Sequence, residues 1–290
     1  MTMSEKIAVV GQVARDLVLG VDHVPGHFEA VPATDRIEVL GGKGANQAVA
    51  LAQLGLPVAL LGVVGEDDHV LEQADGVDVT PVARRAGAVT GLIVNLVDRD
   101  AHWHYVEHLP PEVLLTEDDV SAARDVLRTA RATVVQLQQP PAAALAAVRA
   151  ARGFVVLDGT PRDDDIVAGA DVLRADATEA RELTGARDAD EAVDAGRELL
   201  DRHRLTLVAL AVEGGDVFVW RDGARVFPHG DERVVDTTGA GDALVATLTA
   251  VLVRGGQPAE AAERAVAAAA VAVGHLGGRP RLASFPLRAG

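Results

Sequence analysis

From Glu117 onward, apolar segments of strand length alternate with segments of helical periodicity, and this alternation constrains the fold more than any other feature. Strands that are joined by helical segments imply right-handed crossovers, which place helices on both faces of a parallel sheet. We expect helices at 117–130, 141–151, 178–184, 189–203, 242–254 and 258–273, and strands at 133–137, 154–158, 171–174 and 205–212. The chain is therefore predicted to have an α/β fold with a doubly wound, mostly parallel sheet.

The first hundred residues add core strands and a group of more exposed strands. Residues 7–10 and 58–64 are short apolar runs of the kind found in buried parallel strands. Residues 16–40 and 90–107 instead alternate apolar and polar side chains, which indicates strands with one solvated face. Because the first of these segments separates a core strand from its helix, we expect a small sheet that covers the strand ends.

Composition excludes several classes of protein. With 290 residues, 49% of them hydrophobic, the chain can bury the core of one large domain. The absence of cysteine excludes disulfides, thiolate zinc sites and a cysteine nucleophile. The net charge of -16 argues against nucleic acid or an anionic membrane as partner, since the field would repel both. The chain has no signal-peptide anatomy and no apolar segment of spanning length, so we expect a cytoplasmic protein.

A loop that contains two glycines, Thr237 to Asp242, opens directly into an apolar helical run. Backbone N–H groups at a helix start can bind an anion, and glycine lets the backbone approach a phosphate closely. Asp242 would repel that anion unless it removes a proton from the group that attacks it, and this combination suggests phosphoryl transfer to a hydroxyl. The alternative is an ordinary capped helix, in which the helix dipole favours Asp242 as an early acid.

A second glycine-rich helix start, Gly41 to Asn46, lies near the N-terminus, with Lys43 and Asn46 one turn apart on one face. It does not match the G-x-x-x-x-G-K-[ST] loop of P-loop NTPases, and no dinucleotide fingerprint follows the first strand. In this order and separation, the two stretches resemble the two signature motifs of the ribokinase-like (PfkB) family of carbohydrate and nucleoside kinases.

The resemblance implies one ribokinase-like α/β domain over residues 1–290, with a small β-lid formed by about 16–40 and 90–108. It also implies an ATP-dependent kinase that uses Mg²⁺ and phosphorylates a hydroxymethyl group of a sugar or nucleoside. Lids of this family often pair between subunits, so a homodimer through the lid is expected. Such pairing would cover exposed strand edges that otherwise promote aggregation.

Position by position, the resemblance also implies roles for single residues. Asp242 is the expected general base, and the N–H groups of Gly239, Ala240 and Gly241 form the expected anion hole. The expected acceptor-binding residues are Asp16, Gly42, Lys43, Asn46 and Gln138, and the expected nucleotide-binding residues are Asp176, Glu179, Glu213, Gly215 and Thr238. Glu179 is expected to act indirectly on Mg²⁺, and Asp236 falls at the position of a monovalent cation site.

Several positions depart from the pattern of the family. On the acceptor side, Ala14 replaces an asparagine of ribokinases and Gln138 replaces a glutamate, which argues against ribose itself. On the nucleotide side, the family has an N-x-x-E motif, and Asp176 replaces its asparagine. Leu210 and Val212 replace a threonine and a glycine of a phosphate loop, so that loop loses a hydroxyl donor.

The segment after the last expected helix, Gly277-Gly-Arg-Pro-Arg281, also departs from the family. It carries arginine where ribokinases have a serine near a monovalent cation. Because a guanidinium can take the place of a cation, we expect little activation by potassium.

Two other interpretations stay open at this stage. The altered nucleotide loops also fit a weak or inactive relative that binds a sugar-like ligand as a sensor or partner. Separately, His102, His104 and His108 share one face of an expected strand. That spacing is compatible with a metal site, but carboxylate partners and thiols are not evident, so a solvated or sugar-facing strand is favoured.

Overall fold

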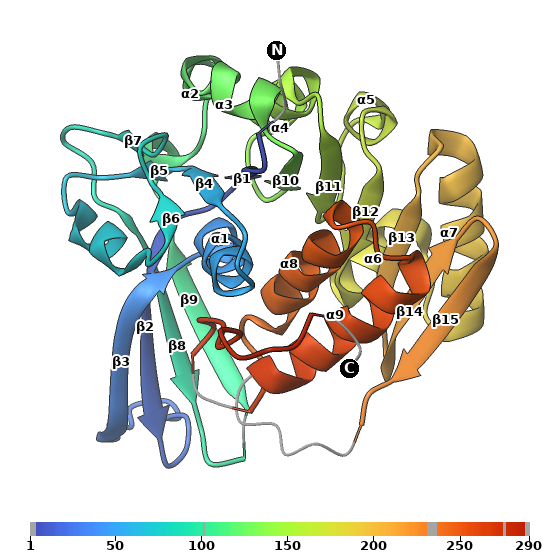
Figure 1. Cartoon of the computed structure of the whole chain (residues 1–290). Coiled ribbons are helices and arrows are strands. Elements are labelled where there is room, and N and C mark those ends of the chain that lie inside the picture. Colours follow the sequence, from blue (N-terminus) through green and yellow to red (C-terminus); the bar gives the residue numbers. More distant parts are fainter. Residues whose placement is uncertain (1–3, 101, 231–236, 275–276, 288–290) are drawn as a thin grey trace.

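A nine-stranded sheet runs through the centre of the molecule (Figure 1). The computed structural model describes residues 4–100, 102–230, 237–274 and 277–287. The strands of this sheet are β1 (Ile7–Val10), β4 (Val58–Leu61), β6 (Val77–Asp78), β10 (Ala132–Gln136), β11 (Phe154–Asp158), β12 (Val172–Ala175), β13 (Leu207–Val212), β14 (Gly215–Trp220) and β15 (Gly223–Pro228). Their order in space is β15-β14-β13-β12-β11-β10-β1-β4-β6. All pairings from β13 to β6 are parallel, and β14 and β15 add an antiparallel hairpin at one edge.

Helices cover both faces of this sheet. One face packs against α1 (Lys43–Gln53), α8 (Ala240–Val253) and α9 (Pro258–Ala272). The other face packs against α2 (Glu117–Ala122), α3 (Arg124–Thr129), α4 (Pro141–Ala150), α5 (Asp164–Ala168), α6 (Ala177–Thr184) and α7 (Ala189–His203). Val9 packs in the apolar core on the α1, α8 and α9 side, and Val10 packs in the core on the other side, because successive side chains of a strand point to opposite faces. The prediction of a doubly wound, mostly parallel α/β fold is confirmed.

A second sheet of four strands contains the segments that were expected to be more exposed. Its strands are β2 (Ala14–Val21), β3 (Ala33–Gly41), β8 (Gly91–Val97) and β9 (Trp103–His108), in the order β3-β2-β8-β9. The central pair is parallel, and both outer pairs are antiparallel. We call it the four-stranded sheet below.

The structure corrects two predicted elements. The strand expected at 58–64 ends at Leu61, and β5 (Val63–Val64) pairs instead with β7 (Ala83–Arg84) in a separate two-stranded sheet. At Gly62, between them, the Val13 side chain occupies the space that a Cβ would need, so this position requires glycine. The helix expected at 117–130 is divided at Ala123 into α2 and α3.

Three short helical segments were not predicted as separate elements: α5, and the 3₁₀ turns η1 (Asp68–Gln73) and η2 (Pro111–Val113). Each is at most six residues long, which is too short to show a helical period in the sequence.

The order of the strands determines where a ligand can bind. From β1 the chain first adds β4 and β6 on one side, and it later adds β10 to β13 on the other. The crossovers that leave β1 and β10 therefore diverge, and a crevice forms beyond the carboxyl ends of these two strands.

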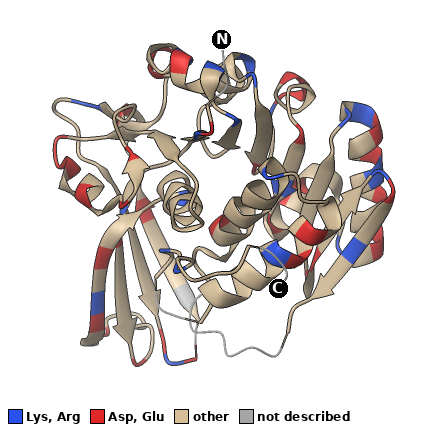
Figure 2. Ribbon diagram, in the orientation of Figure 1, with Lys and Arg blue, Asp and Glu red and all other residues tan. Residues whose placement is uncertain are grey.

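Charged side chains mostly lie away from the central sheet. In Figure 2 the central strands are largely free of charge, whereas β3 and α7 carry many charged residues. The buried charged residues in the described part of the chain are Asp16, Asp119, Asp158, Arg174, Glu179 and Asp242. Across the ranges that the structure covers, no helix combines the length and the apolar character needed to cross a bilayer.

Candidate active site

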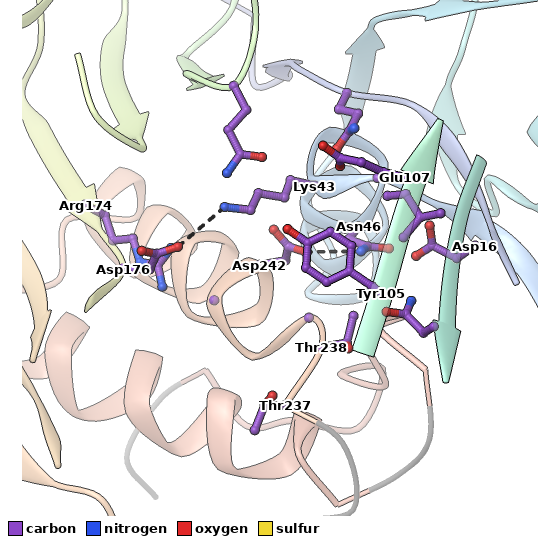
Figure 3. Close-up of a pocket in the computed structure, with 17 residues that line it drawn as sticks. Asp16, Lys43, Asn46, Tyr105, Glu107, Arg174, Asp176, Thr237, Thr238 and Asp242 are labelled. Atoms are coloured by element: carbon purple, nitrogen blue, oxygen red, sulfur yellow. Dashed lines mark hydrogen bonds and ion pairs between the residues drawn. The ribbon is translucent and has the colours of Figure 1, made fainter. Parts of the chain in front are cut away.

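A cleft with a volume of about 330 Å³ opens between the carboxyl edge of the central sheet and the four-stranded sheet (Figure 3). Its lining comes from distant parts of the sequence and consists of Gln12, Asp16, Gly42, Lys43, Asn46, Ile93, Asn95, Tyr105, Glu107, Gln138, Arg174, Asp176, Thr237, Thr238, Gly239, Gly241 and Asp242. The two glycine-bounded helix starts that the sequence singled out therefore meet in one cleft.

The start of α8 is shaped by close contacts that only glycine allows. Gly239 is the N-cap residue, with φ +81° in the left-handed region, and a Cβ there would overlap the Gly278 carbonyl. A Cβ on Gly241 would lie 2.7 Å from Nη2 of Arg174. The Ala240 N–H donates to the Thr237 carbonyl oxygen at 3.3 Å, and Ala240 does not line the cleft. Of the three residues predicted for the anion hole, Gly239 and Gly241 line the cleft.

Asp242 lies in the first turn of α8 and is held from α1. Asn46 Nδ2 donates to one of its carboxylate oxygens at 3.1 Å, and Gln47 Nε2 donates to the other at 3.0 Å. Burial and the neighbouring Asp158 carboxylate raise the pKa of Asp242 to about 6, although Lys43 and the two amides oppose this shift. An acid that merely complemented a helix dipole would have a lowered pKa, so the raised pKa has to come from burial and from Asp158.

Next to Asp242 lies a buried ion pair that the sequence analysis missed. Nη1 of Arg174, at the end of β12, donates to Oδ1 of Asp158, at the end of β11, at 2.9 Å. Gln47 Nε2 donates to the other oxygen of Asp158 at 2.7 Å, so this amide joins Asp158 to Asp242. A signal was present in the sequence, because each charge lies in the last two residues of an otherwise apolar strand. In parallel sheets such positions border the ligand crevice.

Lys43, the first residue of α1, points toward the start of α6 (Figure 3). Its Nζ lies 3.5 Å from Glu179 and 3.9 Å from Asp176. Burial disfavours its charge, but the carboxylates of Asp158 and Glu179 outweigh burial and raise the pKa of Lys43.

Asp176 and Glu179 form a capping box at the start of α6, in which each side chain accepts from the backbone N–H of the other residue at 2.9 Å. Gln138 Nε2 also donates to Glu179 at 3.2 Å. Of these predicted residues, Gln138 and Asp176 line the cleft, and Glu179 lies outside its lining but is hydrogen-bonded to both.

The four-stranded sheet presents one face to the cleft, and its register explains which residues line it. Asp16 is paired with Ile93, Ile93 with Glu107, and Asn95 with Tyr105. Paired residues share a face of the sheet, and all five line the cleft. Asp16 is buried, and its carboxylate fills the space beside Gly41 at the end of β3. The sequence analysis found Asp16 but missed Ile93, Asn95 and Glu107, because their face depends on strand register.

The histidines of β9 lie on the other face. His104 and His108 alternate with Tyr105 and Glu107 along the strand, and both are exposed. Within the described ranges, no group of three or more His, Asp or Glu residues is arranged to hold a metal ion. The favoured expectation of a solvated strand fits this placement, whereas a sugar-facing role does not.

Other predicted positions lie outside the lining of this cleft. Glu213 is exposed in the turn between β13 and β14, and Gly215 begins β14, where a Cβ would lie 2.7 Å from the Phe227 carbonyl oxygen. Asp236 lies outside the described residues, so the structure gives no placement for a monovalent cation there.

The arginine of the C-terminal segment reaches away from the cleft. Arg279 Nη1 donates to the Gln73 side chain at 3.2 Å, and Nη2 contacts the Gln73 carbonyl and, at 3.4 Å, Asp75. Its guanidinium thus joins the C-terminal segment to η1.

The residues around α8 fit the phosphates of ATP. A left-handed glycine N-cap, a close approach of Arg174 to Gly241, and a second cation at Lys43 lie along one wall. Kinase sites usually hold Mg²⁺ through one or two carboxylates together with phosphate oxygens and water. Asp176 and Glu179 fit that role, because each carboxylate keeps lone pairs beyond the hydrogen bond that it accepts in the capping box.

Comparison with known proteins agrees with this arrangement. The family model described as pfkB family carbohydrate kinase matches residues 4–283. Ribokinase of Haemophilus influenzae is 29% identical over 301 residues, with 99% of this chain and 97% of the relative covered. The bifunctional ribokinase/ribose-5-phosphate isomerase A of Fructilactobacillus sanfranciscensis is 27% identical over 263 residues, which cover 86% of this chain and 48% of that longer protein.

Among solved structures, the crystal structure of ribokinase from Thermotoga maritima superposes with a TM-score of 0.80 at 26% identity, covering 95% of each chain. Sequence and structure thus agree over nearly the whole chain, and the fold is the ribokinase fold. On this basis the chain belongs to the pfkB family of carbohydrate kinases, which are phosphotransferases with an alcohol group as acceptor.

Proposed function

We propose that this protein transfers the γ-phosphoryl group of ATP to a primary hydroxyl of an unphosphorylated sugar or nucleoside. The observation that carries the proposal is the setting of Asp242: a buried carboxylate with a pKa raised to about 6, in the first turn of α8 and at the wall of the cleft. A base with a pKa near the working pH combines the ionised form with useful basicity.

The proposed roles divide the cleft into two ends. We call the part around α8, Arg174 and Lys43 the phosphate end, and the part lined by Asp16, Asn95, Tyr105 and Glu107 the acceptor end. When bound, ATP supplies the phosphoryl group, and Mg²⁺ neutralises part of its charge.

At the junction of the two ends, Asp242 accepts the proton of the attacking hydroxyl. Asn46 and Gln47 hold its two carboxylate oxygens in place. The N–H groups of Gly239 and Gly241 are aimed at the charge on the transferring group. Gly42 and Asp16, together with the face of the four-stranded sheet, orient the acceptor, so that sheet acts as the lid.

The charges at the acceptor end favour a neutral acceptor over a sugar phosphate. Among the described residues that line the cleft, the cations are Lys43 and Arg174, and both lie at the phosphate end. The acceptor end instead carries the carboxylates of Asp16 and Glu107. These would accept hydrogen bonds from sugar hydroxyls and would repel a phosphate group.

A homodimer through the four-stranded sheet is part of the proposal. Val106 on β9 is 73% exposed and Phe28, in the connection between β2 and β3, is 101% exposed, so pairing of two lids would cover apolar surface. Light scattering of the wild-type chain and of Val106→Glu tests this, and a monomeric wild type would contradict it.

A phosphorylation screen over pentoses, hexoses and nucleosides with ATP and Mg²⁺ tests the proposed reaction, with Asp242→Asn as the control. We expect turnover of at least one neutral acceptor, and none in the control. Binding of ATP without turnover of any acceptor would instead support an inactive sensor, an alternative that membership of the kinase family does not favour.

A further inference from the structure

We propose that Arg174 is a phosphate-binding residue, which holds the terminal phosphates of the nucleotide against the start of α8. The inference rests on the proposed function, because it assigns the phosphate end of the cleft to ATP. It concerns a residue of this chain that the two glycine motifs do not include.

The geometry leaves one side of the guanidinium directed at the anion loop. Nη1 is tied to Asp158 at 2.9 Å, and Nη2 lies beside Gly241, where it would be 2.7 Å from a Cβ. The residue is 8% exposed, and it lines the cleft together with Gly239, Gly241 and Asp242. A phosphate oxygen at the first turn of α8 would therefore lie within reach of both the loop amides and this guanidinium (Figure 3).

The free-energy cost of burying the Asp158–Arg174 ion pair also points to a ligand. A buried ion pair is often no more stabilising than apolar side chains of similar size, because both charges lose their hydration. Arg174 nevertheless lines the cleft, and its partner Asp158 is buried beside it. Guanidinium groups are suited to phosphate because their donors form a planar fork. The pKa of Arg174 is raised above its ordinary value, since Asp158 and Glu179 outweigh the effect of burial, so the cation persists at every relevant pH.

The neighbouring cation is already engaged, and the other phosphate loop is weakened. Lys43 lies within 4 Å of both Asp176 and Glu179, which reduces its charge toward a phosphate. Leu210 and Val212 are buried at the end of β13, and neither side chain carries a hydroxyl that could bind a phosphate. Arg174 supplies charged N–H donors close to the loop that has lost this neutral hydroxyl donor.

Titration calorimetry with AMP, ADP and ATP–Mg²⁺ tests the proposal through binding alone. The variants are Arg174→Gln and the double variant Arg174→Gln/Asp158→Asn, which also removes the carboxylate that the single change leaves buried and unpaired. We expect both variants to bind ADP and ATP about 10- to 100-fold more weakly than wild type, the range for a lost hydrogen bond to a charged group. Affinity for AMP should change by less than about twofold, because the lost contact is to the terminal phosphates.

An arginine that only neutralises Asp158 would behave differently. In that case the double variant would regain wild-type affinity for ADP and ATP, or all three nucleotides would lose affinity equally, and either result overturns the proposal. The double variant keeps the test valid if the single variant fails to fold. If wild type binds ATP but phosphorylates no acceptor, the proposed function fails while the nucleotide series still decides the role of Arg174. If wild type binds none of the three nucleotides, both proposals fall.

Discussion

The two ends of the cleft are held in place by different means. At the phosphate end, Asp158, Arg174 and Asp242 are each at most 8% exposed, and two amide–carboxylate hydrogen bonds and an ion pair connect them. At the acceptor end, Tyr105 is 51% exposed and Glu107 is also exposed, on the edge strand of the four-stranded sheet.

This difference matches the demands of the two tasks. Groups that stabilise a transition state must be positioned before the reaction begins, and a packed core provides that rigidity. Groups that select the acceptor can be ordered by the acceptor itself, and the more exposed parts of a fold are the ones that open and close at low cost. We therefore expect changes at the phosphate end to reduce kcat, and changes at the acceptor end to raise KM.

The largest effect is expected from Asp242→Asn. Loss of the general base should reduce kcat by at least about three orders of magnitude, the upper part of the range for such groups. Steady-state kinetics on the best acceptor measures this. Near-normal turnover would show that Asp242 is not the general base. The phosphate end would then not differ from the acceptor end in its effect on kcat.

The same variant should be more stable than wild type at alkaline pH. The pKa of Asp242 in the folded chain is raised, so its contribution to stability is present at low pH and is lost as the pH rises through about 6. Asparagine avoids that loss. Thermal unfolding should therefore show a larger gain in Tm for Asp242→Asn at pH 8 than at pH 5, and a lower Tm at pH 8 would show that the charge is not destabilising.

Gly239→Ala should cost about 100-fold in kcat/KM, by analogy with loss of one anion-hole donor. Its matched control is Gly255→Ala, at φ +86° with no atom close to the added Cβ, far from the cleft lining. Both alanines cost about 1–2 kcal/mol because the backbone is left-handed, and Gly239→Ala also meets the Gly278 carbonyl, so its Tm should fall further than that of Gly255→Ala. Equal activities in the two variants would mean that the Gly239 loop does not act on the phosphate.

The pH dependence of kcat/KM should show one ascending limb with an apparent pKa of about 6, from ionisation of Asp242 in the free enzyme. Because Asp158 contributes to raising that pKa, Asp158→Asn should move the limb to lower pH. An unchanged limb in this variant would show that the buried pair does not act on the base.

Changes at the acceptor end should have smaller effects and a different signature. We expect Glu107→Gln to raise KM for the acceptor about tenfold, through the loss of a charge-assisted hydrogen bond, with kcat nearly unchanged. The control is His104→Gln on the same strand. His104 lies on the face that points away from the cleft, so this variant should behave as wild type. A fall in kcat for the Glu107 variant would show that both ends take part in the chemical step.

The smallest effect is expected from potassium. Replacing sodium by potassium should change kcat by less than about twofold if a guanidinium takes the place of the cation. The Arg279 guanidinium binds Gln73 and Asp75 outside the cleft lining, so a small effect of potassium would not by itself assign the place of the cation to this arginine. A large stimulation would show that a monovalent cation site is intact.

Much of the fold could be predicted because its signals are local. The helix at Ala189–His203 matches its predicted bounds, since its apolar period is regular and Asp188 caps it. The strand predicted at 58–64 was too long, because residues 58–61 pair with β1 whereas residues 63–64 pair with β7, which lies later in the chain. Short apolar runs carry no information about such contacts.

The sequence by itself determined the fold class, the two glycine-bounded helix starts and the candidacy of Asp242, because periodicity, glycine and turn chemistry act over a few residues. Only the tertiary structure decided the partners: Asn46 meets Asp242 across 196 positions, and Gln47 meets Asp158 across 111. The raised pKa of Asp242, the Arg174 pair and the cleft-facing side of β9 all follow from such distant neighbours. Burial, Coulomb interactions and strand register all depend on which residues are neighbours in space, and distance along the sequence does not reveal those neighbours.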